Sequence, residues 1–398
     1  METPIADFVR RYADSGMIRA HMPGHKGKPF LGCETLDITE IQGADSLYEA
    51  EGIIRRSESY AGELFGSGRT VYSTEGSSQC IRAMLYLALT CGNGSRTVVA
   101  ARNVHRAFVY SAALLDFEIV WLWPECSSSL CGCPVSPDTL ERTLAEMPAP
   151  PAAVYLTSPD YLGGMADISA LAEVCRKHGT LLAVDNAHGA YLKSLPRSLH
   201  PMDLGADLCS DSAHKTLPAP GQTALLFSSD RFPQQALRRA AALYGSSSPS
   251  YVFLAALDVC RAWMEETGER AYRKTAAAVE RLRARGVRAG LIKLRVFRPF
   301  PAEELAAALA HVKAVAVLDK SEGNSACGGP LFAETRCACY DLPHPPKMID
   351  VVYGLAGRDC AVEDVERVYR RLLHIVQTGE TGPRYVHMGQ RSKQEEVL

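Results

Sequence analysis

The sequence of 398 residues predicts an α/β protein: a mostly parallel sheet with helices on both faces, followed by a smaller α/β domain. Between residues 68 and 229, short apolar runs rich in Val, Leu and Ala alternate with amphipathic segments of about 10 to 15 residues. This alternation gives way to a long helical pattern and restarts after residue 286. The first observation predicts parallel strands joined by helices, and the second predicts two domains.

The first region contains five predicted strands and four predicted helices. The strands are Thr97–Ala101, Phe117–Trp121, Ala152–Leu156, Thr180–Val184 and Thr223–Phe227. The helices are Ser77–Leu89, Val104–Leu115, Ile168–His178 and Pro233–Leu243. Ser, Gly and Pro between residues 126 and 137 predict an irregular surface connection.

A long helical pattern over Tyr251–Arg285, interrupted near Gly268, leads to the second region. The elements predicted there are strands at Gly290–Val296, Val312–Leu318 and Met348–Val352, and helices at Ala302–Ala310, Pro330–Tyr340 and Val362–Val376. With a boundary between Gly268 and Gly286, we expect a first domain over residues 1–272, a second over residues 280–387 and a tail over residues 388–398.

Composition excludes several classes of function. A net charge of −2 gives no reason to expect nucleic acid or an acidic membrane surface as a partner. The first 16 residues carry charges, and no run approaches the roughly 20 apolar residues of a membrane span, so a cytoplasmic protein is expected. The 13 cysteines include two C-x-C pairs, Cys131/Cys133 and Cys337/Cys339, but no C-x-x-C pair of zinc spacing. We therefore expect reduced thiols and no metal site.

Lys215 is the strongest candidate for a chemical role. It stands within Ser212–Thr216, after a short apolar run and before a Pro-Ala-Pro-Gly turn. A lysine that attacks an aldehyde must lose its proton near neutral pH, which burial and a nearby cation can arrange. A lone lysine in a loop is usually solvated, so its neighbours decide the interpretation.

Three further elements follow strands. Asp185 ends one strand, where its carboxylate could pair with a protonated ring nitrogen of a cofactor or cap the next helix. Gly76, Ser77 and Ser78 open a helix, as in a phosphate site or in an ordinary N-cap. His105 follows a third strand and could lie on an aromatic ring, move a proton, or be a satisfied surface histidine.

The order of these elements resembles the fold-type I pyridoxal-phosphate (PLP) enzymes, and the finer motifs resemble the ornithine/lysine/arginine decarboxylase family. The similarity covers about residues 1 to 265, and its His-Met-Pro-Gly-His-Lys-Gly string is quite specific. The matching segments are Arg19–Gly27, Asp37–Glu40, Ala61–Gly66, Thr157–Pro159 with Tyr161, Asp185–Gly189, Ser212–Leu217 and Ser248–Tyr251. Asn186 stands where this family usually has a glutamate, and residues 75–79 are a variant of its phosphate turn; we expect cofactor binding to survive both changes.

This resemblance implies a role for each candidate. Lys215 would hold the PLP aldehyde as a Schiff base, Asp185 the pyridine nitrogen and His105 the ring face. The phosphate end would be met by Gly76, Ser77, Ser78, Ser212 and His214. His188, in the same motif as Asp185, also counts as a cofactor-binding residue. Ser247 would reach the phosphate of a neighbouring subunit, because the sites of this family lie at a dimer interface.

The second region resembles core domain II of pyruvate:ferredoxin oxidoreductase and the related 2-oxoacid oxidoreductase α-chains, over about residues 280 to 387. The matching segments are Gly290–Pro301, Val315–Lys320, Gly328–Phe332 and Tyr353–Asp359. Such a domain is similar to the transketolase C-terminal domain and by itself holds neither thiamine diphosphate nor an iron–sulfur cluster. The chain therefore reads as a hybrid of two families.

Together the resemblances imply a PLP-dependent carbon–carbon lyase of amino-acid metabolism, in the line of polyamine biosynthesis. We expect it to decarboxylate a basic amino acid such as arginine, lysine or ornithine, with His105 or Lys215 returning a proton to Cα. A homodimer or higher homo-oligomer is expected. Two alternatives stay open: other PLP chemistry such as transamination, and a catalytically silent fusion that serves as a subunit of a 2-oxoacid oxidoreductase.

Overall fold

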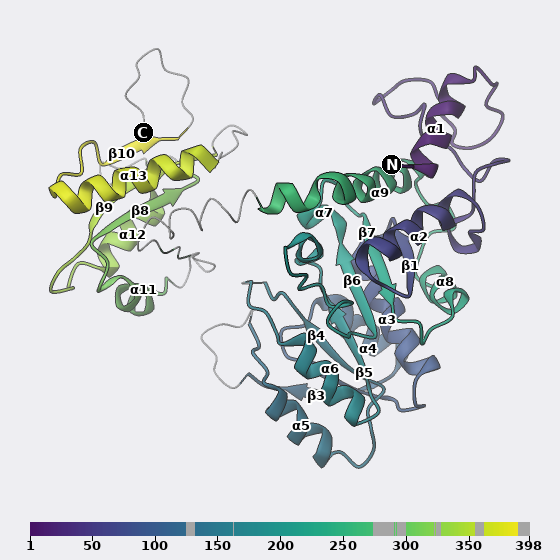
Figure 1. Cartoon of the computed structure of the whole chain (residues 1–398), viewed down its shortest axis with the longest axis horizontal. Helices are drawn as coiled ribbons and strands as arrows, with labels where there is room; N and C mark the ends of the chain where they lie inside the picture. Colours follow the sequence, from purple (N-terminus) through teal and green to yellow (C-terminus); the bar gives the residue numbers. More distant parts are fainter. Residues whose placement is uncertain are drawn as a thin grey trace. The chain divides into compact units, whose positions relative to one another are not determined.

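The structure, a computed structural model, describes residues 1–124, 132–161, 163–273, 300–321, 328–354 and 362–388, and the single residues 290, 292 and 323. The chain divides into two compact units, Met1–Arg273 and Lys274–Leu398 (Figure 1). Each unit has its own sheet. The candidate site residues from the sequence all belong to the first.

A seven-stranded sheet forms the centre of the first unit, in the order β1-β7-β6-β5-β4-β2-β3. Its strands are β1 Arg69–Ser73, β2 Thr97–Ala101, β3 Glu118–Leu122, β4 Ala153–Thr157, β5 Leu181–Asp185, β6 Leu208–Ser212 and β7 Ala224–Ser228. Strand β7 pairs antiparallel with both of its neighbours, β1 and β6, and all other pairs of neighbouring strands are parallel. Since β1 and β6 both oppose β7, β1 through β6 point the same way and end at one edge.

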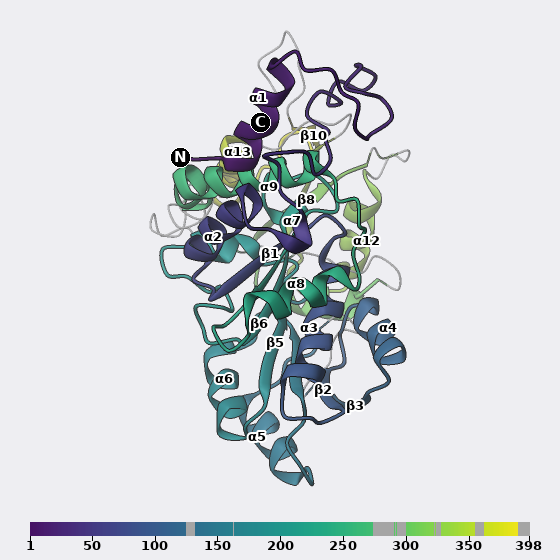
Figure 2. The same cartoon turned by 90° about the vertical axis from the view of Figure 1, so that its right-hand side faces the viewer.

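Helices cover both faces of this sheet. They are α1 Pro4–Asp14, α2 Ile53–Phe65, α3 Ser77–Cys91, α4 Arg106–Leu115, α5 Pro137–Glu146, α6 Ile168–Lys177, α7 Ala213–Thr216, α8 Gln234–Ala242 and α9 Tyr251–Trp263. Figure 2 shows α3 and α4 on one side of the strands and α5 and α6 on the other. Along β2, Val98 packs in the core of α3 and α4, whereas Val99 packs in the core of α5 and α6. Burial on both faces explains why these strands are continuous apolar runs.

Helix α1 is fixed to the unit by a buried carboxylate. The N–H groups of Ile5 and Ala6 donate to Asp258 Oδ2 over 2.8 and 3.1 Å, and Ser57 Oγ donates to Asp258 Oδ1 over 2.6 Å. The first N–H groups of a helix have no partner within it, so a distant carboxylate that accepts two of them stabilises the helix end. This contact joins α1, α2 and α9.

The second unit contains a three-stranded parallel sheet in the order β10-β9-β8. Its elements are α11 Ala302–Leu309, β8 Ala314–Asp319, α12 Pro330–Ala338, β9 Lys347–Val352, α13 Val362–Thr378 and β10 Tyr385–His387. Leu305 and Phe332 of α11 and α12 pack in one core with Met348, while Val368 of α13 packs in another with Ile349. Alternate residues of β9 thus face opposite layers.

The predicted architecture of the first unit is confirmed: a large, mostly parallel α/β sheet with helices on both faces. The five predicted strands there begin and end within one residue of β2, β3, β4, β5 and β7. The π-helical turn Met264–Gly268 follows α9 at the predicted interruption. Most of the predicted strand Gly290–Val296 and of the tail over residues 388–398 lies outside the described residues, and the proposed domain bounds stay a prediction.

Candidate active site

The candidate residues meet at one edge of the seven-stranded sheet. The turn with Gly76 follows β1, His105 follows β2, Asp185 ends β5 and Lys215 follows β6. Because these four strands are parallel in direction, their carboxyl ends lie at the same edge, where open α/β sheets bind ligands. The sheet topology thus brings together residues that are up to 139 positions apart in the sequence.

Asp185 is a buried carboxyl group with few partners. It is 2% exposed, its Oδ1 accepts from the Ala187 N–H over 3.2 Å, and its Oδ2 accepts from the Tyr155 hydroxyl over 3.3 Å. Burial raises the pKa of Asp185 to about 6, against the lowering effects of the Ala187 N–H and of Lys215. A cation placed beside Asp185 would replace the solvation that burial removed.

Lys215 lies at the same sheet edge, in α7, which directly follows β6. Its Nζ lies 3.3 Å from His188 Nε2, and the ring of Tyr161 stands edge-on to His188 with centroids 5.6 Å apart. The Lys215 side chain is exposed, so the burial that was expected, together with a nearby cation, to remove its proton is not found. Lys215 is thus exposed to solvent, whereas the Asp185 carboxyl group, whose pKa the charge of Lys215 lowers, is buried.

His105 is the N-cap of α4. Its Nδ1 accepts from the Ala107 N–H over 3.2 Å, so the proton of the neutral ring is on Nε2. Partial burial, followed by the charges of Lys215, Arg106 and His188, lowers the pKa of His105, even though the residue is exposed. The neutral ring is thus favoured at pH 7.

The turn between β1 and α3 has the features of an anion site. Gly76 has φ +75° and ψ 174°, and its N–H donates to the Gln222 carbonyl over 2.7 Å. Ser77 and Ser78 begin α3, where the N–H groups have no acceptor within the helix. Ser212 Oγ donates to Ser77 Oγ over 2.8 Å, so the turn and the lysine loop are in direct contact.

We expect Gly76→Ala to destabilise the first unit by about 1–3 kcal/mol, because its φ and ψ lie in a region that only glycine occupies readily. Crowding is not the cause: an added Cβ would have the Gln222 carbonyl oxygen, at 3.9 Å, as its nearest neighbour. Urea unfolding of the full chain measures the loss. Gly221→Ala is the control, since that glycine has an ordinary φ and open space around it.

Two of the predicted cofactor residues have less direct support. His214 Nδ1 donates to the Thr223 carbonyl over 3.0 Å, which leaves Nε2 for another partner. Ser247 is exposed, two residues after Gly245, where an added Cβ would lie 2.3 Å from Gln79 Nε2. The loop with Ser247 therefore begins beside the first turn of α3, and its contact with a neighbouring subunit stays a prediction.

Several residues that support the site were not found from the sequence. Tyr155 contacts Asp185 from β4, and Gln79 links the phosphate turn to the rest of the unit by donating to Tyr48 Oη over 2.9 Å and to the Ala241 carbonyl over 2.8 Å. Asp211, a fully buried acid within β6, was also missed. A polar residue on an apolar helix face was the available signal for Gln79, whereas Asp211 lies between Ser210 and Ser212 and gives no such signal.

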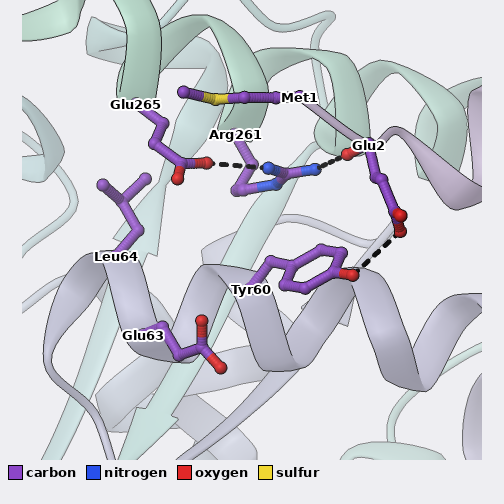
Figure 3. Close-up of a pocket in the computed structure, with 7 residues that line it drawn as sticks. All are labelled: Met1, Glu2, Tyr60, Glu63, Leu64, Arg261 and Glu265. Atoms are coloured by element: carbon purple, nitrogen blue, oxygen red, sulfur yellow. Dashed lines mark hydrogen bonds and ion pairs between the residues drawn. The ribbon is translucent and has the colours of Figure 1, made fainter.

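A pocket of about 330 Å³ lies elsewhere in the first unit, where the N-terminal residues meet α2 and α9 (Figure 3). Two pairs of its polar side chains are hydrogen-bonded: Arg261 donates to Glu265 over 2.9 Å and Tyr60 to Glu2 over 2.9 Å. The lining residues are Met1, Glu2, Tyr60, Glu63, Leu64, Arg261 and Glu265. This set contains neither a lysine nor a histidine, and we therefore assign the chemical site to the sheet edge.

Two family models match the chain. The family described as Orn/Lys/Arg decarboxylase, major domain, matches residues 3–315. The chain belongs to the Orn/Lys/Arg decarboxylase family. Residues 267–365 also match core domain II of pyruvate:ferredoxin oxidoreductase, so both resemblances seen in the sequence are confirmed.

The relatives match this Orn/Lys/Arg decarboxylase family member over only part of their own length. The chain is 30% identical over 278 residues to the uncharacterized protein YaaO and 27% identical over 304 residues to an arginine decarboxylase, both of Bacillus subtilis. These matches cover 67% and 71% of this chain but only 57% and 60% of the relatives. The chain thus spans less than two thirds of the relatives it matches.

A solved structure and a second group of relatives complete the comparison. The Francisella novicida lysine decarboxylase LdcF superposes with a TM-score of 0.61 at 19% identity, over 73% of this chain and 45% of that one, which shows a shared fold. The VorA subunit of ketoisovalerate oxidoreductase from Pyrococcus horikoshii is 41% identical over 105 residues, or 26% of each chain. In the described parts of the chain, no helix combines the length and apolarity needed to cross a membrane.

Proposed function

We propose that the first unit binds PLP and decarboxylates a basic amino acid such as arginine, lysine or ornithine. The observation that supports it most is the position of Lys215, whose Nζ is 3.3 Å from His188 Nε2 at the sheet edge where Asp185 is buried. Membership of the Orn/Lys/Arg decarboxylase family agrees with this chemistry. The choice of amino acid rests on the relatives, one of which is an arginine decarboxylase.

The residues at the edge fit PLP. Asp185 offers a buried carboxylate to a protonated pyridine nitrogen, and the first turn of α3 with Ser212 offers donors to a phosphate. Two buried hydroxyl oxygens at this edge, Thr74 Oγ1 and Thr157 Oγ1, have no hydrogen-bond partner among the described residues. Thr157 pairs in register with Asp185. Since an unpaired buried hydroxyl is costly, a polar ligand between these groups would stabilise the edge.

Each residue then has a role toward the cofactor. Lys215 would hold the aldehyde carbon, Asp185 the ring nitrogen, and the His105 ring one face of the pyridine. Ser77, Ser78, Ser212 and His214 would hold the phosphate, together with Gly76, whose conformation forms the turn. His188 would hold the Lys215 amine, which is its neighbour at 3.3 Å. When bound, PLP supplies an electron sink for the pair left by departing carbon dioxide.

The chain must also supply one proton. Decarboxylation breaks the bond between Cα and the carboxylate, releases carbon dioxide, and leaves Cα to take up a proton. The lowered pKa of His105 favours its neutral form, whose Nε2–H is a weak acid. The donor to Cα that we propose is the Lys215 amine, which lies at the same sheet edge beside His188. The His105 ring then has a positioning role against the cofactor face.

A homodimer is the assembly that we propose for the first unit. Large apolar side chains are exposed on α4 and just after β3: Val109 is 47% exposed, Tyr110 53%, Leu114 67% and Trp123 65%. Exposed apolar groups that lie close in one region mark interaction surfaces. Sedimentation equilibrium of the full chain tests this; a monomer at micromolar concentration would contradict it.

The nine cysteines in the described residues are free thiols, which supports a reducing compartment such as the cytoplasm.

One observation favours a second candidate, a catalytically silent fusion that serves as a subunit of a 2-oxoacid oxidoreductase. The second unit shares more identity with VorA, 41%, than the first unit shares with the decarboxylases, about 30% or less. Stable co-purification with a thiamine- and cluster-containing partner, without turnover by the isolated chain, would favour this candidate.

The test of the proposed function is an absorbance titration of the full chain with PLP, followed by a carbon dioxide assay over a panel of amino acids. We expect a visible absorbance band that the free cofactor lacks, and carbon dioxide release from arginine, lysine or ornithine in amounts equal to the amine formed. A keto acid product in place of carbon dioxide would indicate transamination. Absence of the band at saturating PLP would contradict cofactor binding and with it the proposal.

A further inference from the structure

A cluster of buried polar groups lies in the strand next to Asp185. Asp211 of β6 is 0% exposed. Its Oδ1 accepts from Asn186 Nδ2 over 2.6 Å and from Cys209 Sγ over 3.5 Å. Its Oδ2 lies 3.0 Å from His200 Nε2. His200 is also 0% exposed. The nitrogen, sulfur and oxygen atoms of His200, Cys209 and Asp211 lie within 4.8 Å of one another.

The hydrogen bonds of His200 determine the charge of this cluster. The Met202 N–H donates to His200 Nδ1 over 3.3 Å, so Nδ1 is an acceptor and the proton of the neutral ring is on Nε2. His200 Nε2–H therefore donates to Asp211. With donors from His200, Asn186 and Cys209, Asp211 is the acceptor in every contact, which is the hydrogen-bonding pattern of an ionised carboxylate.

The cluster is connected to Asp185 through the backbone and through Asn186. Asp185 pairs in register with Ser210, the residue before Asp211, and the Asn186 N–H donates to the Ser210 carbonyl over 2.9 Å. The Asn186 side chain then returns to Asp211. Asn186 thus fixes the turn that follows Asp185 against β6. The negative charge of Asp211 acts on Asp185 and raises its pKa, in addition to the larger effect of burial.

We infer that Asp211 is a positioning residue for the proposed decarboxylation: a second buried anion that helps Asp185 keep a proton on the ring nitrogen of PLP. The inference rests on the proposed function. Burying an anion costs free energy even where hydrogen bonds compensate part of it, so a chain that needed only packing at this position would be at least as stable with an apolar residue. Two carboxylates near one ring nitrogen strengthen the protonated form of the ring more than Asp185 alone.

Other titratable groups at this place do not supply that charge. Facing Asp185 are Tyr155 from β4, Lys215 from α7 and Cys80 from α3. Burial raises the pKa of the Tyr155 hydroxyl and of the Cys80 and Cys209 thiols, so these groups stay neutral. Lys215 carries the opposite charge. Asp211 is therefore the anion that adds to Asp185.

A cofactor analogue without a ring nitrogen distinguishes an effect of the Asp211 charge on the ring nitrogen from a purely structural role of Asp211. The full chain is titrated with PLP and with its 1-deaza analogue, which has C–H in place of the nitrogen, and the ratio of the two dissociation constants is recorded. We expect Asp211→Asn to reduce the preference for PLP about fivefold, as coupling within one hydrogen-bonded network allows. Cys209→Ser, on the same face of the same strand, should leave the preference unchanged because it keeps the charge of Asp211.

His200→Gln provides a second variant, because it keeps the Asp211 charge while it replaces one donor. It should lower the melting temperature and leave the preference for PLP within twofold of wild type. If Asp211→Asn weakens both compounds equally, or if His200→Gln lowers the preference as much as Asp211→Asn, the cluster is structural and the inference is wrong. Should Asp211→Asn fail to fold, a preference for PLP in His200→Gln that falls by more than twofold would contradict the inference, because this variant keeps the Asp211 charge. Wild-type chain that binds neither compound would instead contradict the proposed function itself.

Discussion

Lys215→Ala is expected to abolish the visible absorbance of the chain with PLP and to lower amine production by about 10³-fold or more. The amine of Lys215 is the group that would hold the aldehyde and return the proton to Cα, so its removal affects both binding and turnover. The side chain is exposed and makes one described contact, with His188, so the fold should tolerate the change with less than about 0.5 kcal/mol of lost stability.

Lys177→Ala is the matched control. Its side chain is 67% exposed and pairs with Glu141 at the surface, away from the sheet edge, so the variant should keep the absorbance band and turnover. Spectra of both variants at equal PLP concentration, with thermal melts to show equal folding, provide the comparison. An unchanged band in Lys215→Ala would mean that another amine holds the aldehyde, and the assignment of Lys215 would be wrong.

The strands of the first unit could be predicted from the sequence because burial on both faces leaves a continuous apolar run. Val98 and Val99 of β2 face different cores, and both must be apolar. The direction of β7 could not be predicted, since an antiparallel strand buried on both faces has the same composition as a parallel one. Strand β10, Tyr385–His387, is only three residues long and gives no periodic signal.

The candidate site was predictable to the extent that its residues follow strands. Asp185 stands directly after a short apolar run, and the segment Ser212–Thr216 with Lys215 follows the run Ala206–Cys209, so the parallel order placed them at one edge. Tyr155 and Asp211 lie inside strands, and their contacts depend on register, such as the pairing of Thr157 with Asp185. Register between distant strands is fixed by packing and cannot be obtained from the local sequence.

The exposure of Lys215 is the point on which sequence reasoning was least successful. Burial together with a nearby cation was the expected means of removing its proton, but the Lys215 side chain is exposed. The buried titratable group is Asp185 instead. If PLP binds as proposed, an exposed amine and a buried carboxyl group would leave the aldehyde end open to substrate and keep water from the ring nitrogen.

Asp185→Asn is expected to increase the stability of the cofactor-free chain at pH 8. Burial raises the pKa of Asp185 from 3.8 to about 6, so the folded state prefers the neutral acid more than the unfolded state does. The stability due to this preference is fully present below pH 3.8 and is lost as the pH rises to about 6. The whole difference between the folded and unfolded pKa of Asp185 corresponds to a loss on the order of 3 kcal/mol in the free energy of unfolding at high pH. A neutral amide at this position avoids that loss.

The asparagine should retain the important contacts, because its Oδ1 can accept from the Ala187 N–H and its amide can donate to the Tyr155 hydroxyl. Because the replacement is imperfect, we expect Asp185→Asn to raise the free energy of unfolding by about 2 kcal/mol at pH 8. The gain should become smaller toward pH 4.5, because the folded wild-type acid is already protonated there. Urea unfolding at the two pH values measures it. Asp230→Asn, whose carboxylate is 81% exposed, should show no comparable pH-dependent gain.

The same variant should lose activity while it gains stability. An amide cannot act as the anion beside a protonated ring nitrogen, so turnover is expected to fall by about 10²-fold or more. Opposite changes in stability and activity from one isosteric substitution would identify Asp185 as a carboxylate kept in the core for chemistry at a cost in stability. A variant that is less stable than wild type at pH 8 and equally active would instead make Asp185 a structural cap, and the sheet edge would lose its ring-nitrogen site.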